Sequence, residues 1–70
     1  MNEMLAKQLP SPQALLDTYR RFGPVGPVYE VADVIRELDD GDTLMKIIVV
    51  QTGEEAEYRY THILDDPKES

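Results

Sequence analysis

The segment TLMKIIVVQ, Thr43–Gln51, decides the fold, because it has the pattern of a β-strand with apolar side chains on both faces. Side chains alternate between the two faces of a strand. One face therefore carries Met45, Ile47 and Val49, and the other carries Leu44, Ile48 and Val50. Both faces must be covered, and a chain of 70 residues has few other elements with which to cover them.

A helix is predicted on the N-terminal side of this strand, over residues 12–22. Ser11 and Pro12 suit a helix start, since serine can accept a bond from a free backbone N–H and proline is tolerated at the first position. The apolar side chains that follow repeat at helical spacing: Leu15, Leu16, Tyr19 and Phe22. The Gly-Pro pair at 23–24 then ends the helix. This apolar stripe is expected to cover one face of the sheet.

Residues 28–38, VYEVADVIREL, fit both a helical stripe and a strand. The β-branched side chains favour a strand, and so does the turn sequence DDGD at 39–42. A strand here would also give the central strand an immediate neighbour, whereas a helix would leave only a two-stranded hairpin, which is marginal alone. A strand is therefore predicted, with a helix as the alternative.

A third strand is predicted after the turn Thr52-Gly53-Glu54, because apolar and polar residues alternate from Ala56 to Thr61. Thr61 is then expected to cap a short helical turn over residues 62–65. The predicted fold class is α+β, with one N-terminal helix packed on a three-stranded antiparallel β-meander and a short C-terminal helical turn. Residues 1–10 are expected to be an N-terminal arm or tail, 11–66 a single domain, and 67–70 a C-terminal tail.

This fold leaves the second apolar face of the central strand without a cover. A small domain of this size usually gains stability from disulfides, a metal or a partner. The chain has no cysteine and one histidine, so disulfides and a classical zinc cluster are excluded. A homodimer is therefore predicted, with or without exchange of a strand, through Leu44, Ile48 and Val50; a sheet curled into a small barrel is the monomeric alternative.

Charge and hydropathy narrow the classes of partner. Fourteen acidic and seven basic residues give a net charge of −7, and the cations are scattered along the chain. Nucleic acids and anionic membrane surfaces are therefore disfavoured as ligands. No apolar run approaches the roughly 20 residues of a membrane span, and the first residues lack the pattern of a signal peptide, so a cytoplasmic protein is expected.

No catalytic, cofactor-binding or metal-binding residue is predicted. The acidic segment 39–42 does not match a calcium loop, because the twelfth residue from Asp39 is Val50 and not glutamate. His62 has no nucleophile at a telling spacing, and the glutamates after Gly53 are expected at an open hairpin tip. The protein is therefore predicted to be a non-enzyme.

Two functions are considered, and both are forms of binding. The first is a non-enzymatic, homodimeric protein-interaction module. The alternative is an acidic inhibitor, antitoxin-like or nucleic-acid-mimicking protein that binds a basic partner. The predicted partner surface combines two tyrosines with the acidic turns: Tyr58, Tyr60, Asp40, Asp42, Glu54, Glu55 and Glu57.

The chain also resembles a family of small uncharacterised bacterial proteins. The resemblance rests on GPVGPVYEV, on DDGDTLMKIIVVQTGEEAEY and on the closing ILDDP, and it covers roughly residues 12–67. It implies a compact α+β domain of bacterial origin. It implies no activity and no catalytic residue.

Overall fold

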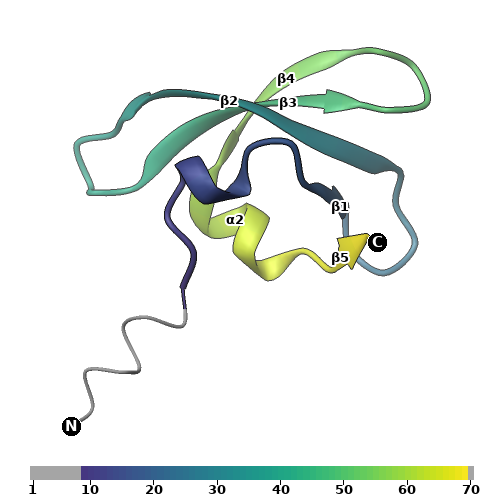
Figure 1. Ribbon diagram of the computed structural model, residues 1–70, viewed down its shortest axis with the longest axis horizontal. Coiled ribbons are helices and arrows are strands. Elements are labelled where there is room, and N and C mark those ends of the chain that lie inside the picture. The colour runs from purple at the N-terminus through teal and green to yellow at the C-terminus, as the bar shows by residue number, and fades with distance from the viewer. Residues whose placement is uncertain (1–8, 70) are drawn as a thin grey trace, which may run out of the picture.

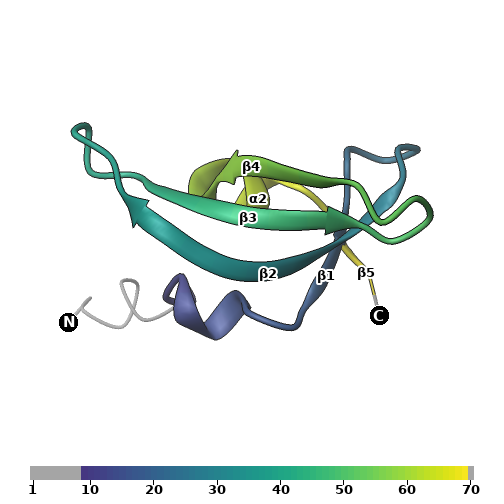
Figure 2. The ribbon, with the colours of Figure 1, turned by 90° about the horizontal axis from the view of Figure 1, so that it is seen from above.

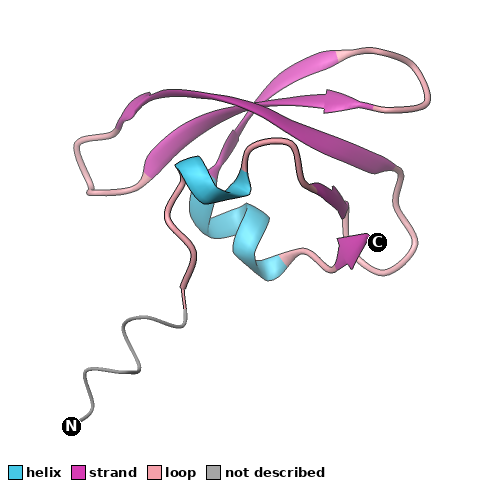
Figure 3. Cartoon of the chain, viewed as in Figure 1, coloured by secondary structure: helices cyan, strands magenta, loops and turns pink. Residues whose placement is uncertain are grey.

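The central strand of the prediction is β3 (Thr43–Val49), which lies inside a five-stranded antiparallel sheet of order β4-β3-β2-β1-β5. The computed structural model describes residues 9–69. Its other elements are η1 (Gln13–Leu15), β1 (Tyr19–Arg21), β2 (Val28–Glu37), β4 (Glu55–Arg59), α2 (Tyr60–Asp65) and β5 (Lys68–Glu69). The two helical segments lie on the same side of the long strands (Figures 1 and 3).

The strands β2, β3 and β4 follow one another in the sequence and lie side by side in the sheet (Figure 2). The strand prediction for residues 28–38 is therefore confirmed, and so are the two hairpin turns that flank β3. Gly41 and Gly53 adopt positive φ angles of 92° and 77° in these turns. Glycine reaches this region without the steric cost that other residues have.

The core lies between the sheet and the helical segments. Its fully buried side chains come from β2, β3 and α2: Tyr29, Val31, Met45, Ile47 and Ile63. Leu15 of η1 is almost as buried. The face predicted for Met45 and Ile47 is thus the inner face of the sheet. Isoleucine 63 projects from α2 into this core, so the C-terminal helix supplies part of the cover that the sequence assigned to an N-terminal helix.

The outer face of β3 is partly covered by charged side chains of its neighbours. In the register of the sheet, Leu44 lies between Arg36 and Arg59, and Ile48 lies between Glu30 and Glu55. Both apolar side chains are half-buried. The aliphatic stems of long charged side chains can cover apolar surface in this way while the charged groups stay in water.

The predicted N-terminal helix over residues 12–22 is wrong. Only η1 is helical there, and the chain turns at Asp17, whose φ is 67°, before it enters β1. The backbone of Asp17 and Thr18 bonds Val31 with N···O distances of 2.9 Å. These bonds to β2 lead the chain into β1, which pairs with β2 from Tyr19 onward, so pairing between distant segments overrides a local helical pattern. The fold is mostly a five-stranded antiparallel sheet. The predicted fold, an N-terminal helix on a three-stranded meander, is therefore wrong.

The C-terminal helical segment begins two residues earlier than the predicted turn over residues 62–65, so Thr61 lies inside the helix and does not cap it. Helix α2 starts at Tyr60, the residue before it is Arg59, and no side chain of Arg59 caps the helix. The alternating pattern predicted that Tyr58 and Tyr60 share one face of a strand. Tyr60 lies in α2 instead, so the two residues do not share a strand face. Lys68 and Glu69, from the segment predicted as a tail, pair with β1 as β5. Most of the arm or tail expected for residues 1–10 lies outside the described residues.

Candidate binding surfaces

The three residues predicted for a dimer interface lie along the outer side of the sheet. Leu44 and Ile48 are half-buried, and Val50 follows the end of β3 with 54% of its surface exposed. Lys46 lies between the first two on the same face, and its cross-strand neighbours are Asp33 and Glu57. The outer face is therefore a short apolar row that charged residues interrupt and border.

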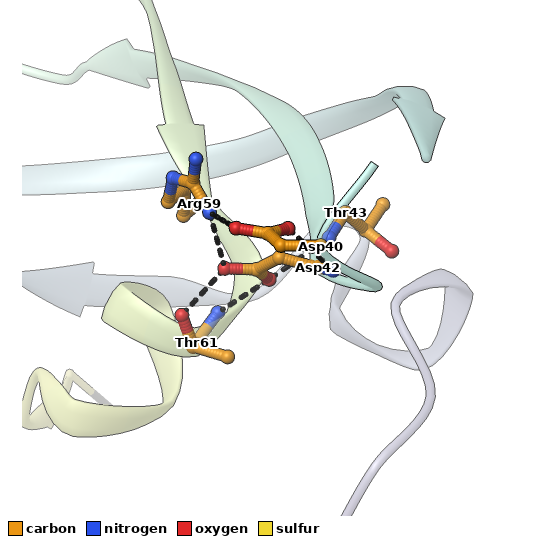
Figure 4. A network of polar contacts seen from close by, with 5 residues as sticks. All are labelled: Asp40, Asp42, Thr43, Arg59 and Thr61. Carbon is orange, nitrogen blue, oxygen red and sulfur yellow. Dashed lines mark hydrogen bonds and ion pairs between the residues drawn. The ribbon is translucent and has the colours of Figure 1, made fainter. Parts of the chain in front are cut away.

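Asp40 and Asp42, predicted to face a partner, bind residues of this chain (Figure 4). Asp42 accepts bonds from Thr61 Oγ1 at 2.7 Å and from the Thr61 backbone N–H at 3.3 Å. Arg59 Nη1 donates to Asp40 at 2.6 Å and to Asp42 at 3.3 Å. These four residues, here called the Asp42 clasp, tie the β2–β3 hairpin to the start of α2, where free backbone N–H groups need acceptors.

The clasp favours the ionised form of both aspartates. The hydrogen bond from Arg59 lowers the pKa of Asp40, and the hydrogen bond from Thr61 is the largest cause that lowers the pKa of Asp42. The Asp42 side chain is only 8% exposed, whereas that of Asp40 is 57% exposed. Asp42 is therefore a structural residue of the hairpin, and the surface available to a partner is mainly at Asp40.

The glutamates of the second acidic group lie at and beside β4, the strand at one edge of the sheet. Glu54, Glu55 and Glu57 are exposed, as is Ala56 between the last two. A shallow groove runs across the outer face at this point, lined by Asp33, Val34, Ile35, Lys46, Glu55, Ala56 and Glu57. Lys46 forms an ion pair with Glu55 at 3.5 Å. The groove lining thus contains three carboxylates and one ammonium group.

The two predicted partner-facing tyrosines bind other parts of the chain. Tyr58 donates to Asp66 Oδ2 at 3.0 Å, and the buried Tyr29 donates to the same oxygen at 2.7 Å. Tyr60 donates to the carbonyl of Pro10. The rings of Phe22, Tyr29 and Tyr58 pack around this point in tilted and edge-to-face arrangements, with centroids 4.5 to 5.6 Å apart. The aromatic cluster therefore serves first to fix the segment that follows α2.

This environment holds Tyr29 and Tyr58 in their neutral form. Burial is the largest cause, and the hydrogen bond to Asp66 adds to it. Together they raise the pKa of Tyr58 to about 12 and raise that of the more deeply buried Tyr29 further above its ordinary value. Neither hydroxyl is poised as a base near neutral pH.

Sequence reasoning missed two residues with unusual surroundings. Asp66 collects both tyrosine hydroxyls and the Gly23 backbone N–H, the latter at 3.3 Å. Arg20, assigned to a helix end, is 6% exposed within the sheet. Nothing local in the sequence signalled either set of contacts.

The described residues contain no cluster of three or more histidine or acidic side chains arranged to hold a metal ion. Within residues 9–69, no helix has the length and apolar character needed to cross a membrane.

Fold and surface together define a small, acidic, mainly antiparallel sheet domain with a charged outer face. Residues 7–70 match the model of a family of unknown function, DUF5397, and the chain belongs to this family. It is also 43% identical over 49 residues to an uncharacterized protein of Haemophilus influenzae, a match that spans 70% of this chain and 78% of that protein. The expected resemblance to a family of uncharacterised bacterial proteins is confirmed; its motif pattern stays a prediction. The function of the family is unknown.

Proposed function

We propose that this protein is a non-enzymatic interaction module that binds a basic protein segment along β4 and the adjoining outer face. The observation that carries the proposal is the open edge of β4, where Glu55 and Glu57 are exposed beside a groove that also contains Asp33. Charge complementarity steers partners and selects among them. A cationic segment is the partner that this surface would attract.

The backbone of β4 offers a second means of recognition. Val49 N–H donates to the carbonyl of Glu54 at 2.8 Å, so residues 54, 56 and 58 direct their backbone groups toward β3. The groups of Glu55 and Glu57 therefore point away from β3, to the free side of the edge strand. An added strand could pair with them. Acidic side chains on an edge strand oppose pairing with a second acidic strand, so they favour a basic one.

A homodimer through the outer face is the second candidate. It is supported by the apolar row of Leu44 and Ile48 and by the exposure of Val50. Two copies that met face to face would bring their carboxylates close together, and the resulting repulsion makes this candidate weaker than a basic partner. Light scattering over a dilution series separates the two, since a mass that halves on dilution is expected only for the homodimer.

The test of the leading proposal uses a synthetic peptide of alternating lysine and valine, followed by backbone amide NMR of the full chain. We expect saturable shifts that centre on residues 55–59, and binding that weakens severalfold when salt is raised to about 0.3 M. The charge-reversal variant Glu55→Lys/Glu57→Lys should lose this binding.

The matched control is Asp39→Lys/Asp65→Lys, which changes the net charge equally at two exposed sites that belong neither to β4 nor to the lining of the groove. It should keep most of the binding. If both variants lost peptide binding equally, the loss would be due to the change in net charge, and this result would contradict a site on β4. Shifts of the same size with an alternating glutamate–valine peptide would contradict the proposal as a whole.

A further inference from the structure

A second groove lies apart from β4, among η1, β1, β5 and the end of α2. This groove has a volume of about 690 Å³, within the range of pockets that hold small molecules. Its walls are largely apolar, with Leu15 and Ala14 from the η1 segment and Leu64 from α2. Arg20 and Lys68 also line it. None of these residues belongs to the proposed β4 surface.

Arg20 is the unusual member of this lining. It is 6% exposed, and its Nη1 donates to the Asp66 carbonyl at 3.0 Å. Its Nε is buried and has no hydrogen-bond partner. Among residues 9–69, no carboxylate forms an ion pair with it: the adjacent Glu69 pairs with Arg21 at 3.1 Å. Charged groups are rarely buried in proteins without a partner, because their desolvation is costly.

A second cation lies beside Arg20. The register of β1 and β5 places Lys68 directly opposite Arg20, so both side chains leave the same face of the sheet. The groove therefore combines apolar walls with a guanidinium and an ammonium group at one place. A guanidinium edge matches the two oxygens of a carboxylate.

We propose that this groove binds a small monocarboxylate with an apolar chain. Its carboxylate would pair with Arg20 and Lys68, and its chain would lie against Leu15 and Leu64. A singly charged group fits better than a phosphate, because the chain as a whole carries a charge of −7 and the acidic Glu69 also lines the groove. The volume suits a chain of several carbons, and Leu15 and Leu64 offer that chain apolar surface.

The experiment is a titration of the full-length protein with octanoate, followed by backbone amide NMR. We expect saturable shifts at residues 14–20 and 64–69, with weaker or no shifts for octanol and octylamine, which have the same chain length without the carboxylate. Arg20→Gln should weaken octanoate binding by roughly tenfold or more, as expected for the loss of a charge-assisted pair. Arg36→Gln, an exposed arginine on β2, is the control and should bind as the wild type does.

A variant that leaves Arg20 in place keeps the proposal testable if Arg20→Gln fails to fold. Ala14 is exposed on η1 and lines the groove, so Ala14→Trp should obstruct the apolar part with little effect on the core. Loss of octanoate binding in this variant supports the site. Binding that survives both changes, shifts that centre on β4, or equal binding of octylamine would overturn it, and would leave Arg20 with a purely structural role.

Discussion

The hydroxyl group of Tyr29 donates a 2.7 Å hydrogen bond to Oδ2 of Asp66, and this bond joins residues 37 positions apart in the sequence. Tyr58 donates to the same oxygen, so one carboxylate connects β2, β4 and the segment after α2. Tyr29 is fully buried. Asp66 is the acceptor to which its hydroxyl donates.

Replacement of Asp66 by alanine is therefore expected to destabilise the fold by about 2–3 kcal/mol, because it leaves at least one buried hydroxyl without an acceptor. Asp66→Asn should cost less, since its amide oxygen can still accept a bond. Urea unfolding of the three proteins measures the difference. The control is Asp65→Asn at the exposed neighbouring position, for which a change within about 0.5 kcal/mol is expected. Similar losses at both positions would contradict a specific role for Asp66.

The Asp42 clasp predicts a stability that depends on pH in the acid range. The clasp lowers the pKa values of Asp40 and Asp42 in the folded state. Their contribution is therefore present in full above the unfolded value near about pH 4, and it is lost as the pH falls through the lowered folded values. Asp42→Asn should be less stable than the wild type at pH 7, and the difference should shrink as the pH falls toward 2 or so.

Urea midpoints at several pH values test this prediction, with Asp39→Asn as the control because Asp39 is exposed in the same turn. Asp39→Asn should follow the wild-type curve. A difference between Asp42→Asn and wild type that stays constant from pH 7 to about pH 2 would show that the carboxylate charge is not involved.

The middle of the fold could be predicted from the sequence because its signals are local. The alternation in Thr43–Gln51 and the turns at Gly41 and Gly53 define β2, β3 and β4 with little help from distant residues. The N-terminal part could not be predicted in the same way. Its apolar spacing suits a helix, and its actual conformation depends on the free edge of β2.

The candidate surfaces follow the same division. The exposure of the glutamates after Gly53 was predicted, because an open hairpin tip was expected there. The contacts of Asp42 depend on where α2 begins, and those of Asp66 and Arg20 depend on sheet pairing between residues far apart in the chain. From residue type alone, the acidic residues were expected in turns and exposed to solvent. Only the three-dimensional arrangement distinguishes the structural Asp42 from the exposed Glu57.

Gly26 is predicted to be the glycine least tolerant of substitution, for steric reasons. A Cβ atom at this position would lie 2.1 Å from the Phe22 carbonyl oxygen, so the backbone would have to move. Gly26→Ala should therefore cost about 1–3 kcal/mol or more, as for other overpacked sites. At Gly53 a Cβ atom would meet nothing within 4 Å, and Gly53→Ala should cost only the roughly 1–2 kcal/mol of its positive φ. Thermal unfolding of both variants measures the order; a larger loss at Gly53 would contradict it.

The tyrosines at Asp66 predict a second pH dependence, at the alkaline end. Burial, followed by the hydrogen bond to Asp66, raises the pKa of Tyr58 to about 12, so the folded state retains a proton that the unfolded chain loses near pH 10. The stability from this group is therefore present in full below about pH 10 and is lost as the pH rises to about 12. Tyr58→Phe should lose less stability than the wild type over this interval. Asp66→Asn should shift the ultraviolet titration of the tyrosines toward lower pH, because it removes the acceptor charge. An unchanged titration in Asp66→Asn would contradict the role assigned to the carboxylate.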